Sequence, residues 1–154
     1  MSLVQSAPHF TTAEALGFAQ QLFGITATAT PLTSERDQNF LLTTTDGAHY
    51  VLKIANAQEE RAILDLQNAT INHITAQDTI PVAHLQPTLA GQTITTVTGV
   101  EGVTHFVRLL TYLPGKPLGA VKPHAPELLY SLGEYLGNLD KALSTFDHPA
   151  ADRV

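Results

Sequence analysis

The stretch His49-Tyr50-Val51-Leu52-Lys53-Ile54-Ala55 is an apolar, β-branched run that contains a single lysine. It predicts a β-strand in which Val51 and Lys53 share one face while the alternate side chains share the other. The dipeptide Asp46-Gly47 just before it is a hairpin-turn signal, and residues 39–44 before the turn form a second β-like run. The sequence therefore predicts an antiparallel hairpin with Lys53 in its second strand.

A helix and another strand are predicted before this hairpin. Thr11-Thr12-Ala13-Glu14 has the pattern of a capping box, and Gly24 suits the C-terminal end of the helix that the box opens. Residues 26–32, rich in threonine and alanine, predict a first strand. A polar loop over residues 33–39 then leads into the hairpin.

More helices and strands follow the hairpin. Residues 58–76 have helical periodicity, and Ile80-Pro81 ends the segment because the residue before a proline avoids the helical region. Further strands are predicted at residues 82–85, 93–98 and 105–112, with turns at 90–91 and 99–102. Leu113-Pro114-Gly115-Lys116-Pro117 is a connector through which neither a strand nor a helix can continue.

The last predicted element is a long amphipathic helix over residues 126–145. Its apolar stripe consists of Leu128, Leu132, Tyr135 or Leu136, Leu139 and Leu143.

Composition narrows the classes of partner. The chain has 154 residues, 44% of them hydrophobic, and a net charge of −6, so clustered cations for a nucleic acid or an anionic membrane are not expected. It has no cysteine and no apolar run of about 18 residues, which fits a cytoplasmic protein without membrane spans. Its seven histidines never pair four residues apart with a third ligand nearby, so no metal site is predicted.

Lys53 is the candidate binding residue. On spacing alone, a lone lysine in a strand is more often an exposed side chain than a ligand. The surroundings favour a ligand: the polar loop can place backbone N–H groups over phosphates, and the hairpin places the lysine beneath that loop. The helix that follows can orient the amine, which is the arrangement that kinases use for phosphoryl transfer.

The chain resembles the amino-terminal lobe of the aminoglycoside phosphotransferase and choline kinase-like family, and hydroxylysine kinase-type members in particular. The stretches that carry the resemblance are residues 34–42, 50–54, Leu64-Asp65-Leu66-Gln67, Pro81-Val82 and 107–115. It implies an α+β protein-kinase-like small lobe over residues 1–112, with an antiparallel sheet of about five strands plus helices. Residues 113–154 would be the inter-lobe connector and the first helix of the large lobe.

The resemblance also implies a nucleotide site. Lys53 would contact phosphates, the loop with Ser34, Asp37 and Asn39 would cover the nucleotide, and backbone groups of residues 110–113 would bind adenine. The named nucleotide-binding residues are Lys53, Ser34, Asp37, Asn39, Gln67, Thr111 and Leu113. ATP and magnesium are the implied cofactors of the parent protein, and pyridoxal phosphate only if that parent is fused to a class III aminotransferase.

Three departures from the family pattern stand out. The glutamate that usually pairs with the lysine falls at Gln67, with Glu60 and Asp65 as alternatives if the helix is shifted. The covering loop has no glycine. No histidine is followed two residues later by aspartate, as the family's His-x-Asp-x-x-x-x-Asn loop requires, so no catalytic residue is predicted and the chain alone is expected to be inactive.

Two functions are therefore open. The first is the nucleotide-binding amino-terminal fragment of an ATP-dependent kinase that acts on a hydroxyl of a small amine or amino acid. The alternative is a non-catalytic ligand-binding or protein-interaction module with the same fold. In either case the apolar stripe from Leu128 to Leu143 is expected to be partly bare, which predicts a homodimer or aggregation through this helix.

Overall fold

The computed structural model describes residues 7–99 and 102–151. The elements follow in the order α1 (Thr12–Phe23), β1 (Ala27–Leu32), β2 (Gln38–Thr44), β3 (His49–Ile54), α2 (Arg61–Gln77), β4 (Leu85–Gln86), β5 (Thr95–Thr98), β6 (Thr104–Thr111), η2 (Leu118–Ala120), α3 (Pro126–Leu143) and η3 (Pro149–Ala151). The predicted helices and strands are thus all present, with small shifts at their ends.

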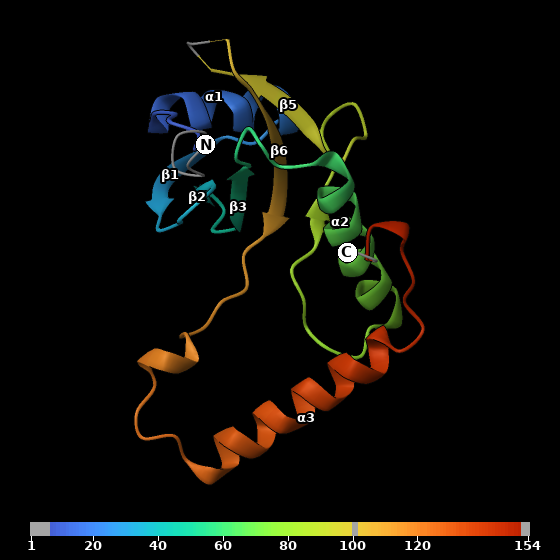
Figure 1. Cartoon of the computed structure of the whole chain (residues 1–154). Coiled ribbons are helices and arrows are strands. Elements are labelled where there is room, and N and C mark those ends of the chain that lie inside the picture. Colours follow the sequence, from blue (N-terminus) through green and yellow to red (C-terminus); the bar gives the residue numbers. More distant parts are fainter. Residues whose placement is uncertain (1–6, 100–101, 152–154) are drawn as a thin grey trace.

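The strands form one antiparallel sheet of six strands in the order β1-β2-β3-β6-β4, with β5 also paired to β6. This confirms the predicted antiparallel sheet with helices, with six strands where about five were expected for the lobe, β4 being only two residues long. Helix α1 lies over one face of the sheet and α2 lies beside β6, while α3 runs below, away from the strands (Figure 1).

Helix α1 covers one face of the sheet and closes the main core there. Its start is the predicted capping box, in which the Thr11 hydroxyl accepts from the backbone N–H of Glu14 and the Glu14 carboxylate accepts from that of Thr11. Gly24 ends it with φ of 70°, a left-handed conformation that glycine adopts without strain. The fully buried side chains beneath it are Phe40, Leu42, Leu52, Ile54, Val107 and Leu109.

Two predicted boundaries are wrong for local reasons. The polar loop ends at residue 37, because Gln38 already begins β2. The Gln38 side-chain oxygen accepts from the backbone N–H of Phe10, and its amide nitrogen donates to the Phe10 carbonyl. Helix α2 starts at Arg61 rather than at residue 58, because the side-chain oxygen of Asn56 accepts from the backbone N–H of Gln58 and holds a turn there.

Two other predictions differ less. Of residues 82–85 only Leu85 is in a strand, since β4 spans Leu85–Gln86. The predicted turn at 99–102 has its ends in place, with the N–H of Gly102 donating to the carbonyl of Gly99 at 2.9 Å, but residues 100–101 lie outside the described residues.

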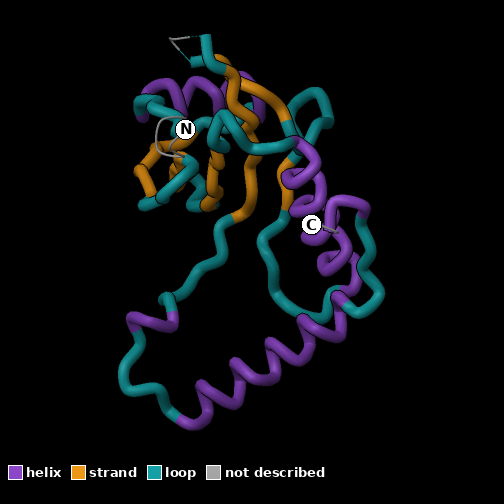
Figure 2. Tube along the Cα trace, in the orientation of Figure 1, coloured by secondary structure: helices purple, strands orange, loops and turns teal. Residues whose placement is uncertain are grey.

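Helix α3 is attached to the rest of the protein at its C-terminal end. Ala142 is buried against Ile74 and Ile80, with Tyr135, Leu139 and Leu143 packed around them. The carbonyl of Ala142 accepts from His73 Nε2 at 3.0 Å and from Gln77 Nε2 at 2.9 Å. Side chains of α2 thus satisfy a carbonyl in the last turn of α3, which otherwise lacks a helical partner. Figure 2 shows the C-terminal end of α3 beside α2.

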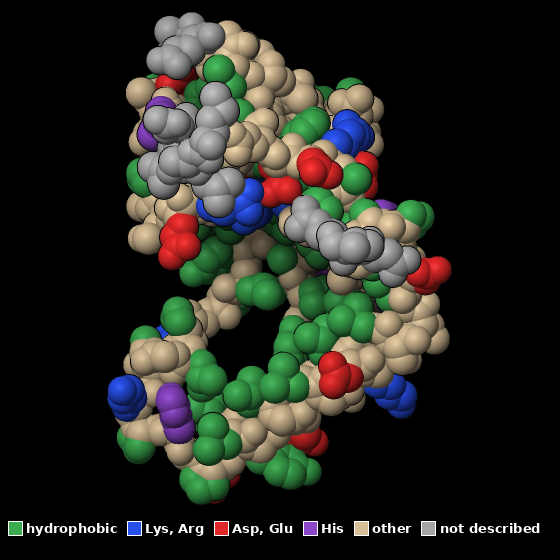
Figure 3. All heavy atoms as spheres, viewed as in Figure 1, with side chains coloured by type: hydrophobic (Ala, Val, Ile, Leu, Met, Phe, Trp, Pro, Cys, Tyr) green, Lys and Arg blue, Asp and Glu red, His purple; other side chains and the backbone are tan. Residues whose placement is uncertain are grey.

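The other half of α3 stays largely uncovered. Leu129 and Leu136 are each 49% exposed and Tyr130 is 71% exposed. Hydrophobic side chains gather along the side of this helix that looks toward the sheet (Figure 3). Of the predicted stripe in this half, Leu136 is exposed and Leu128 and Leu132 are half-buried, whereas Leu129 and Tyr130 are exposed outside the predicted stripe. Within the described residues, none of the helices has the length and apolar character needed to cross a membrane.

Candidate functional site

Lys53 lies in a row of three polar side chains that crosses the sheet. In the strand register Lys53 of β3 is paired with Asn39 of β2 on one side and with Arg108 of β6 on the other. Directly opposed residues of antiparallel strands have their side chains on the same face. This face is the one opposite the α1 core, so Lys53 and Arg108 are neighbouring cations on it.

Arg108 is held by α2 through two neutral amides. Its guanidinium donates from NH1 to Asn68 Oδ1 at 2.8 Å and from NH2 to Gln67 Oε1 at 2.6 Å. The Asn68 amide nitrogen donates in turn to Thr93 Oγ1 at 3.3 Å, which fixes the orientation of the amide. Arg108 is only 4% exposed and Asn68 5%, so this contact is internal.

In this structure the Gln67 oxygen accepts from Arg108, and among the described residues no hydrogen bond joins Gln67 to Lys53. The two alternatives do not replace it. Glu60 is the exposed residue just before α2, and Asp65 pairs with Arg61 at 3.5 Å on the helix surface. Among the described residues no carboxylate lies within 4.0 Å of the Lys53 amine.

Lys53 is half-buried, and its environment disfavours its charge. Burial lowers the pKa of the Lys53 amine, and Arg108 lowers it further, while the carboxylate of Asp37 partly offsets both. A half-buried ammonium with a cation beside it and no ion-pair partner is poorly compensated. The amine is thus placed to gain strongly from an incoming anion.

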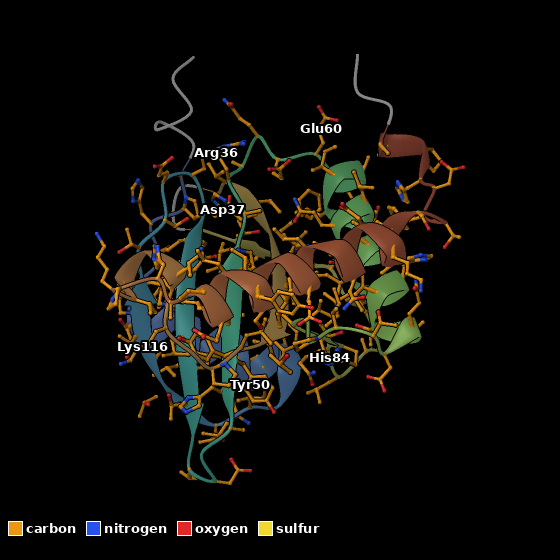
Figure 4. The ribbon with its side chains drawn as sticks, turned by 90° about the horizontal axis from the view of Figure 1, so that it is seen from below. Arg36, Asp37, Tyr50, Glu60, His84 and Lys116 are labelled. Carbon is orange, nitrogen blue, oxygen red and sulfur yellow. The ribbon has the colours of Figure 1, made fainter. Side chains whose placement is uncertain are left out.

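Asp37 is used to anchor the loop between β1 and β2. Its carboxylate accepts from the backbone N–H of Asn56 at 3.1 Å, and the fully buried Asn56 side chain donates to the carbonyl of Arg36 at 3.3 Å. Arg36 also pairs with Glu59 at 3.7 Å. Arg36 and Asp37 lie at the same end of the molecule as Glu60 (Figure 4). The loop is therefore fixed to the turn between β3 and α2, while Ser34 is exposed in it.

Asn39 has an unsatisfied oxygen beside the lysine. Its side-chain Oδ1 is buried and has no hydrogen-bond partner among the described residues. A buried acceptor without a donor costs about 1–3 kcal/mol. In the row that contains Lys53, the Asn39 oxygen thus has no hydrogen-bond donor and the Lys53 ammonium has no anionic partner.

A second row on the same face is apolar. Leu41, Val51 and Leu110 are paired across β2, β3 and β6, and Leu110 is also paired with Leu85 of β4. These residues are two positions along each strand from Asn39, Lys53 and Arg108, a rise of about 6.8 Å. The face therefore presents an apolar strip beside a cationic strip.

The chain leaves the sheet next to this apolar strip. The N–H of Thr111 donates to the carbonyl of His84 at 2.9 Å and that of Tyr112 to His49 at 3.0 Å, so both of these backbone donors are engaged. The Thr111 hydroxyl also accepts from the N–H of His84 at 2.9 Å. Leu113 is 49% exposed, and its N–H has no hydrogen bond to any described residue.

Sequence reasoning missed Arg108, Asn68 and Asn56. Arg108 had a visible signal, since it is a cation in an otherwise apolar predicted strand, as Lys53 is. Asn68 falls within the helix predicted over residues 58–76 with nothing in the sequence to mark it, and the structure buries it against Arg108. Nothing in the sequence singles out Asn56, because its role depends on two segments that meet only in the fold.

The arrangement suits an amphipathic, anionic ligand. The cationic row can attract phosphate or another polyanion through charge-assisted hydrogen bonds. The apolar row can cover the flat face of a ring, and the free N–H of Leu113 can donate to a ring nitrogen. A separate, open cavity of about 300 Å³ lies at the C-terminal end of α2, lined by Thr75, Asp78, Thr79, Ile80, Pro81 and His84.

Known proteins share this sequence and fold. A family model described as "Phosphotransferase enzyme family" matches residues 28–153. The hydroxylysine kinase of Danio rerio is 33% identical over 155 residues, which are 97% of this chain and 43% of that protein. The hydroxylysine kinase of Mus musculus is 34% identical over 161 residues, with 96% and 42% covered. The chain thus spans less than half the length of these curated relatives.

Solved structures confirm the predicted kinase-like small lobe. A structure titled "Amicoumacin kinase hAmiN in complex with AMP-PNP, Ca2+ and Ami" superposes with a TM-score of 0.73 at 18% identity, covering 91% of this chain and 42% of that one. A microcompartment-associated aminopropanol kinase gives a TM-score of 0.72 at 12% identity, covering 94% and 44%. Because the family model matches residues 28–153, which are most of the chain, the chain belongs to the phosphotransferase enzyme family.

Proposed function

We propose that this chain is the nucleotide-binding lobe of an ATP-dependent kinase that phosphorylates a hydroxyl of a small amine or amino acid. The observation that carries the proposal is the pair of rows on one face of the sheet. Leu41, Val51 and Leu110 form the apolar row, and Asn39, Lys53 and Arg108 form the cationic row. ATP has the same division, with a flat base at one end and phosphates at the other.

Each predicted site residue has a role in this proposal. Lys53 contacts phosphate oxygens as a point charge, and the unpaired Oδ1 of Asn39 receives a hydrogen bond from the lysine when the nucleotide draws it inward. The free N–H of Leu113 donates to the base, next to Thr111 at the end of β6. Asp37 holds the loop that carries Ser34 above the phosphates.

Gln67 has an indirect role, because its oxygen fixes Arg108 rather than Lys53. Within the described part of the chain, no three histidine, aspartate or glutamate side chains gather closely enough to hold a metal ion. In this proposal magnesium is bound through the phosphates of the nucleotide. Pyridoxal phosphate plays no part in the proposal.

The relatives supply the substrate class. The hydroxylysine kinases and the aminopropanol kinase are named for small amines that carry a hydroxyl group. The amicoumacin kinase structure was solved with AMP-PNP and Ca2+. By extension, the whole protein would use ATP with a divalent cation, residues 1–112 would form its small lobe, and residues 113–154 would lead into the substrate-binding part. The cytoplasm is the expected compartment.

Nucleotide titration of the 154-residue chain tests the proposal. ATP binding is measured by calorimetry for the wild-type protein, for Lys53→Ala, and for the control Lys141→Ala on the exposed side of α3. Loss of one charge-assisted contact should weaken ATP binding roughly tenfold or more in Lys53→Ala and leave the control unchanged. Equal affinity of the three proteins would refute the proposed role of Lys53.

A second candidate is a non-catalytic binding module with the same fold. It is favoured by the engagement of Gln67 with Arg108, which leaves Lys53 without the orienting partner that kinases of this fold use. Phosphoryl transfer by a protein that extends to the length of the curated relatives would eliminate it for that protein.

The exposed part of α3 supports one further proposal, that two copies of this chain associate through this helix. Leu129, Leu136 and Tyr130 are bare and would be covered in such a homodimer. Proteins rarely leave a continuous apolar strip of this kind in water.

A further inference from the structure

Arg108 is a buried cation that forms no ion pair with any described carboxylate. It is 4% exposed, and its two hydrogen bonds go to the uncharged oxygens of Gln67 and Asn68. Among the described residues no carboxylate lies within 4.0 Å of the guanidinium. An ionised side chain in the interior is costly unless it is paired, so such an arrangement calls for an explanation.

The second cation of the site increases that cost. Lys53 lies directly across from Arg108 in the ladder between β3 and β6, and it too has no carboxylate partner within this distance in the described part of the chain. Two like charges that face each other across a strand pair are destabilising. The carboxylates whose charge reaches the pair are Asp37 and Glu59. Asp37 accepts from the backbone N–H of Asn56, and Glu59 forms an ion pair with Arg36.

We propose that Arg108 is a positioning residue of the phosphate site, and that α2 holds it through neutral amides so that its charge remains available to a polyphosphate. This deepens the proposed function and rests on it. Gln67 and Asn68 fix the plane of the guanidinium without cancelling its charge. Together Arg108 and Lys53 then provide two positive charges for a ligand that carries several negative ones.

Gln67 is the residue that separates this proposal from the usual kinase arrangement. In that arrangement a carboxylate on this helix pairs with the lysine and strengthens the site. Here a carboxylate at position 67 would pair with Arg108 instead, because the Gln67 oxygen is already 2.6 Å from the guanidinium. Gln67→Glu therefore weakens polyphosphate binding in our proposal, whereas it would strengthen it in the usual arrangement.

The charge of the ligand should matter as much as its shape. Two uncompensated cations favour ATP over ADP, and ADP over adenosine, more strongly than one cation does. The preference for ATP over adenosine should also fall steeply as salt is added, because salt screens the attraction between the phosphates and the two cations. The ratio of ATP affinity to adenosine affinity is thus a measure of the site's charge that does not depend on how well the base fits.

The test measures ATP and adenosine binding to the 154-residue chain in five proteins. They are the wild type, Gln67→Glu, the control Gln21→Glu, Arg108→Gln and its conservative counterpart Arg108→Lys. Gln21 is exposed on α1, across the sheet from the site, so the control adds the same charge elsewhere. Gln67 is also exposed, so Gln67→Glu leaves the protein folded even if Arg108→Gln does not.

We expect Gln67→Glu to lower the ATP-to-adenosine affinity ratio roughly tenfold, while the control leaves it unchanged. Arg108→Gln should lower the ratio by about the same factor and Arg108→Lys should largely restore it. A higher ratio in Gln67→Glu, or an unchanged one, would overturn this inference while leaving the nucleotide site in place. A wild-type protein that binds neither ligand would overturn the proposed function itself and this inference with it.

Discussion

Arg108 and Lys53 face each other across the ladder between β6 and β3, and neither has a carboxylate within 4.0 Å among the described residues. Each cation raises the cost of the other, and burial adds to that cost for both. The fold therefore maintains a concentration of positive charge that does not serve its own stability. A binding site commonly has this property, because the stabilising partner is the ligand.

The cost of the Lys53 charge should appear in the pH dependence of stability. Burial and Arg108 lower the pKa of Lys53 below its ordinary value of 10.5. Between the two values the unfolded chain binds more protons than the folded one, so the free energy of unfolding rises with pH in that window. Below the window the full cost is present. We expect Lys53→Met to be more stable than wild type at pH 7, with an advantage that shrinks toward pH 10.5.

Urea unfolding of both proteins across this range provides the measurement. The exposed Lys141→Met serves as the control and should follow wild type at every pH. If Lys53→Met were instead less stable than wild type at neutral pH, the charge of Lys53 would be well compensated in the folded protein, contrary to the geometry described.

Asn39 is expected to lower the stability of the free protein and to strengthen ATP binding. Its buried side-chain oxygen lacks a partner, and asparagine is a poor strand residue, so Asn39→Val removes an unpaired polar group from β2. We expect the free energy of unfolding to stay the same or rise by up to about 2 kcal/mol. ATP affinity should fall, because the lysine loses its acceptor. A destabilised variant in thermal or chemical unfolding would show that Asn39 has a structural partner.

Asn56 should be essential for the loop over the site. Its fully buried side chain donates to the carbonyl of Arg36 and accepts from the N–H of Gln58, so Asn56→Ala removes both hydrogen bonds. The expected cost is about 1–3 kcal/mol, since each lost hydrogen bond contributes about 0.5–1.5 kcal/mol. Hydrogen exchange should also quicken in residues 33–37, whereas Asn138→Ala on the exposed side of α3 should change neither quantity. Unchanged exchange in the loop would mean that other contacts hold it.

The exposed half of α3 should control self-association. Leu129 and Leu136 are seven residues apart and therefore lie on the same side of the helix, each 49% exposed. Replacing both with glutamate should reduce a dimer to a monomer in light scattering, since charge would have to be buried in the contact. Asn138→Glu on the exposed polar side is the matched control. A wild-type chain that stays monomeric over a wide concentration range would contradict the proposed homodimer.

Local patterns in the sequence are enough to predict most elements of this fold. The capping box at Thr11, the hairpin turn at Asp46-Gly47 and the amphipathic pattern of α3 each depend on neighbours in the chain, and each prediction is confirmed. The start of α2 lies three residues later than predicted, because Asn56 holds a turn with Gln58 and is itself bonded to the carbonyl of Arg36, 20 residues earlier in the chain. Periodicity carries no information about such contacts.

The candidate site was predictable only in part, for a similar reason. Lys53 stands out because a charge in an apolar strand is unusual, and the resemblance to a kinase lobe gave it a role. The partner of Gln67 was not predictable, since the choice between Lys53 and Arg108 depends on how α2 is turned over the sheet. The apolar row of Leu41, Val51 and Leu110 follows from the register of three strands, which the sequence does not specify before they are paired.

The most direct test of the nucleotide site is to titrate the isotope-labelled chain with ATP and follow its backbone amide signals by NMR. We predict that the signals that move lie on β2, β3 and the end of β6, around Leu41, Lys53 and Leu113. The amides of α1, on the opposite face of the sheet, should stay where they are. Shifts confined to the cavity at the end of α2, between Thr75 and His84, or no shifts at all, would contradict the account.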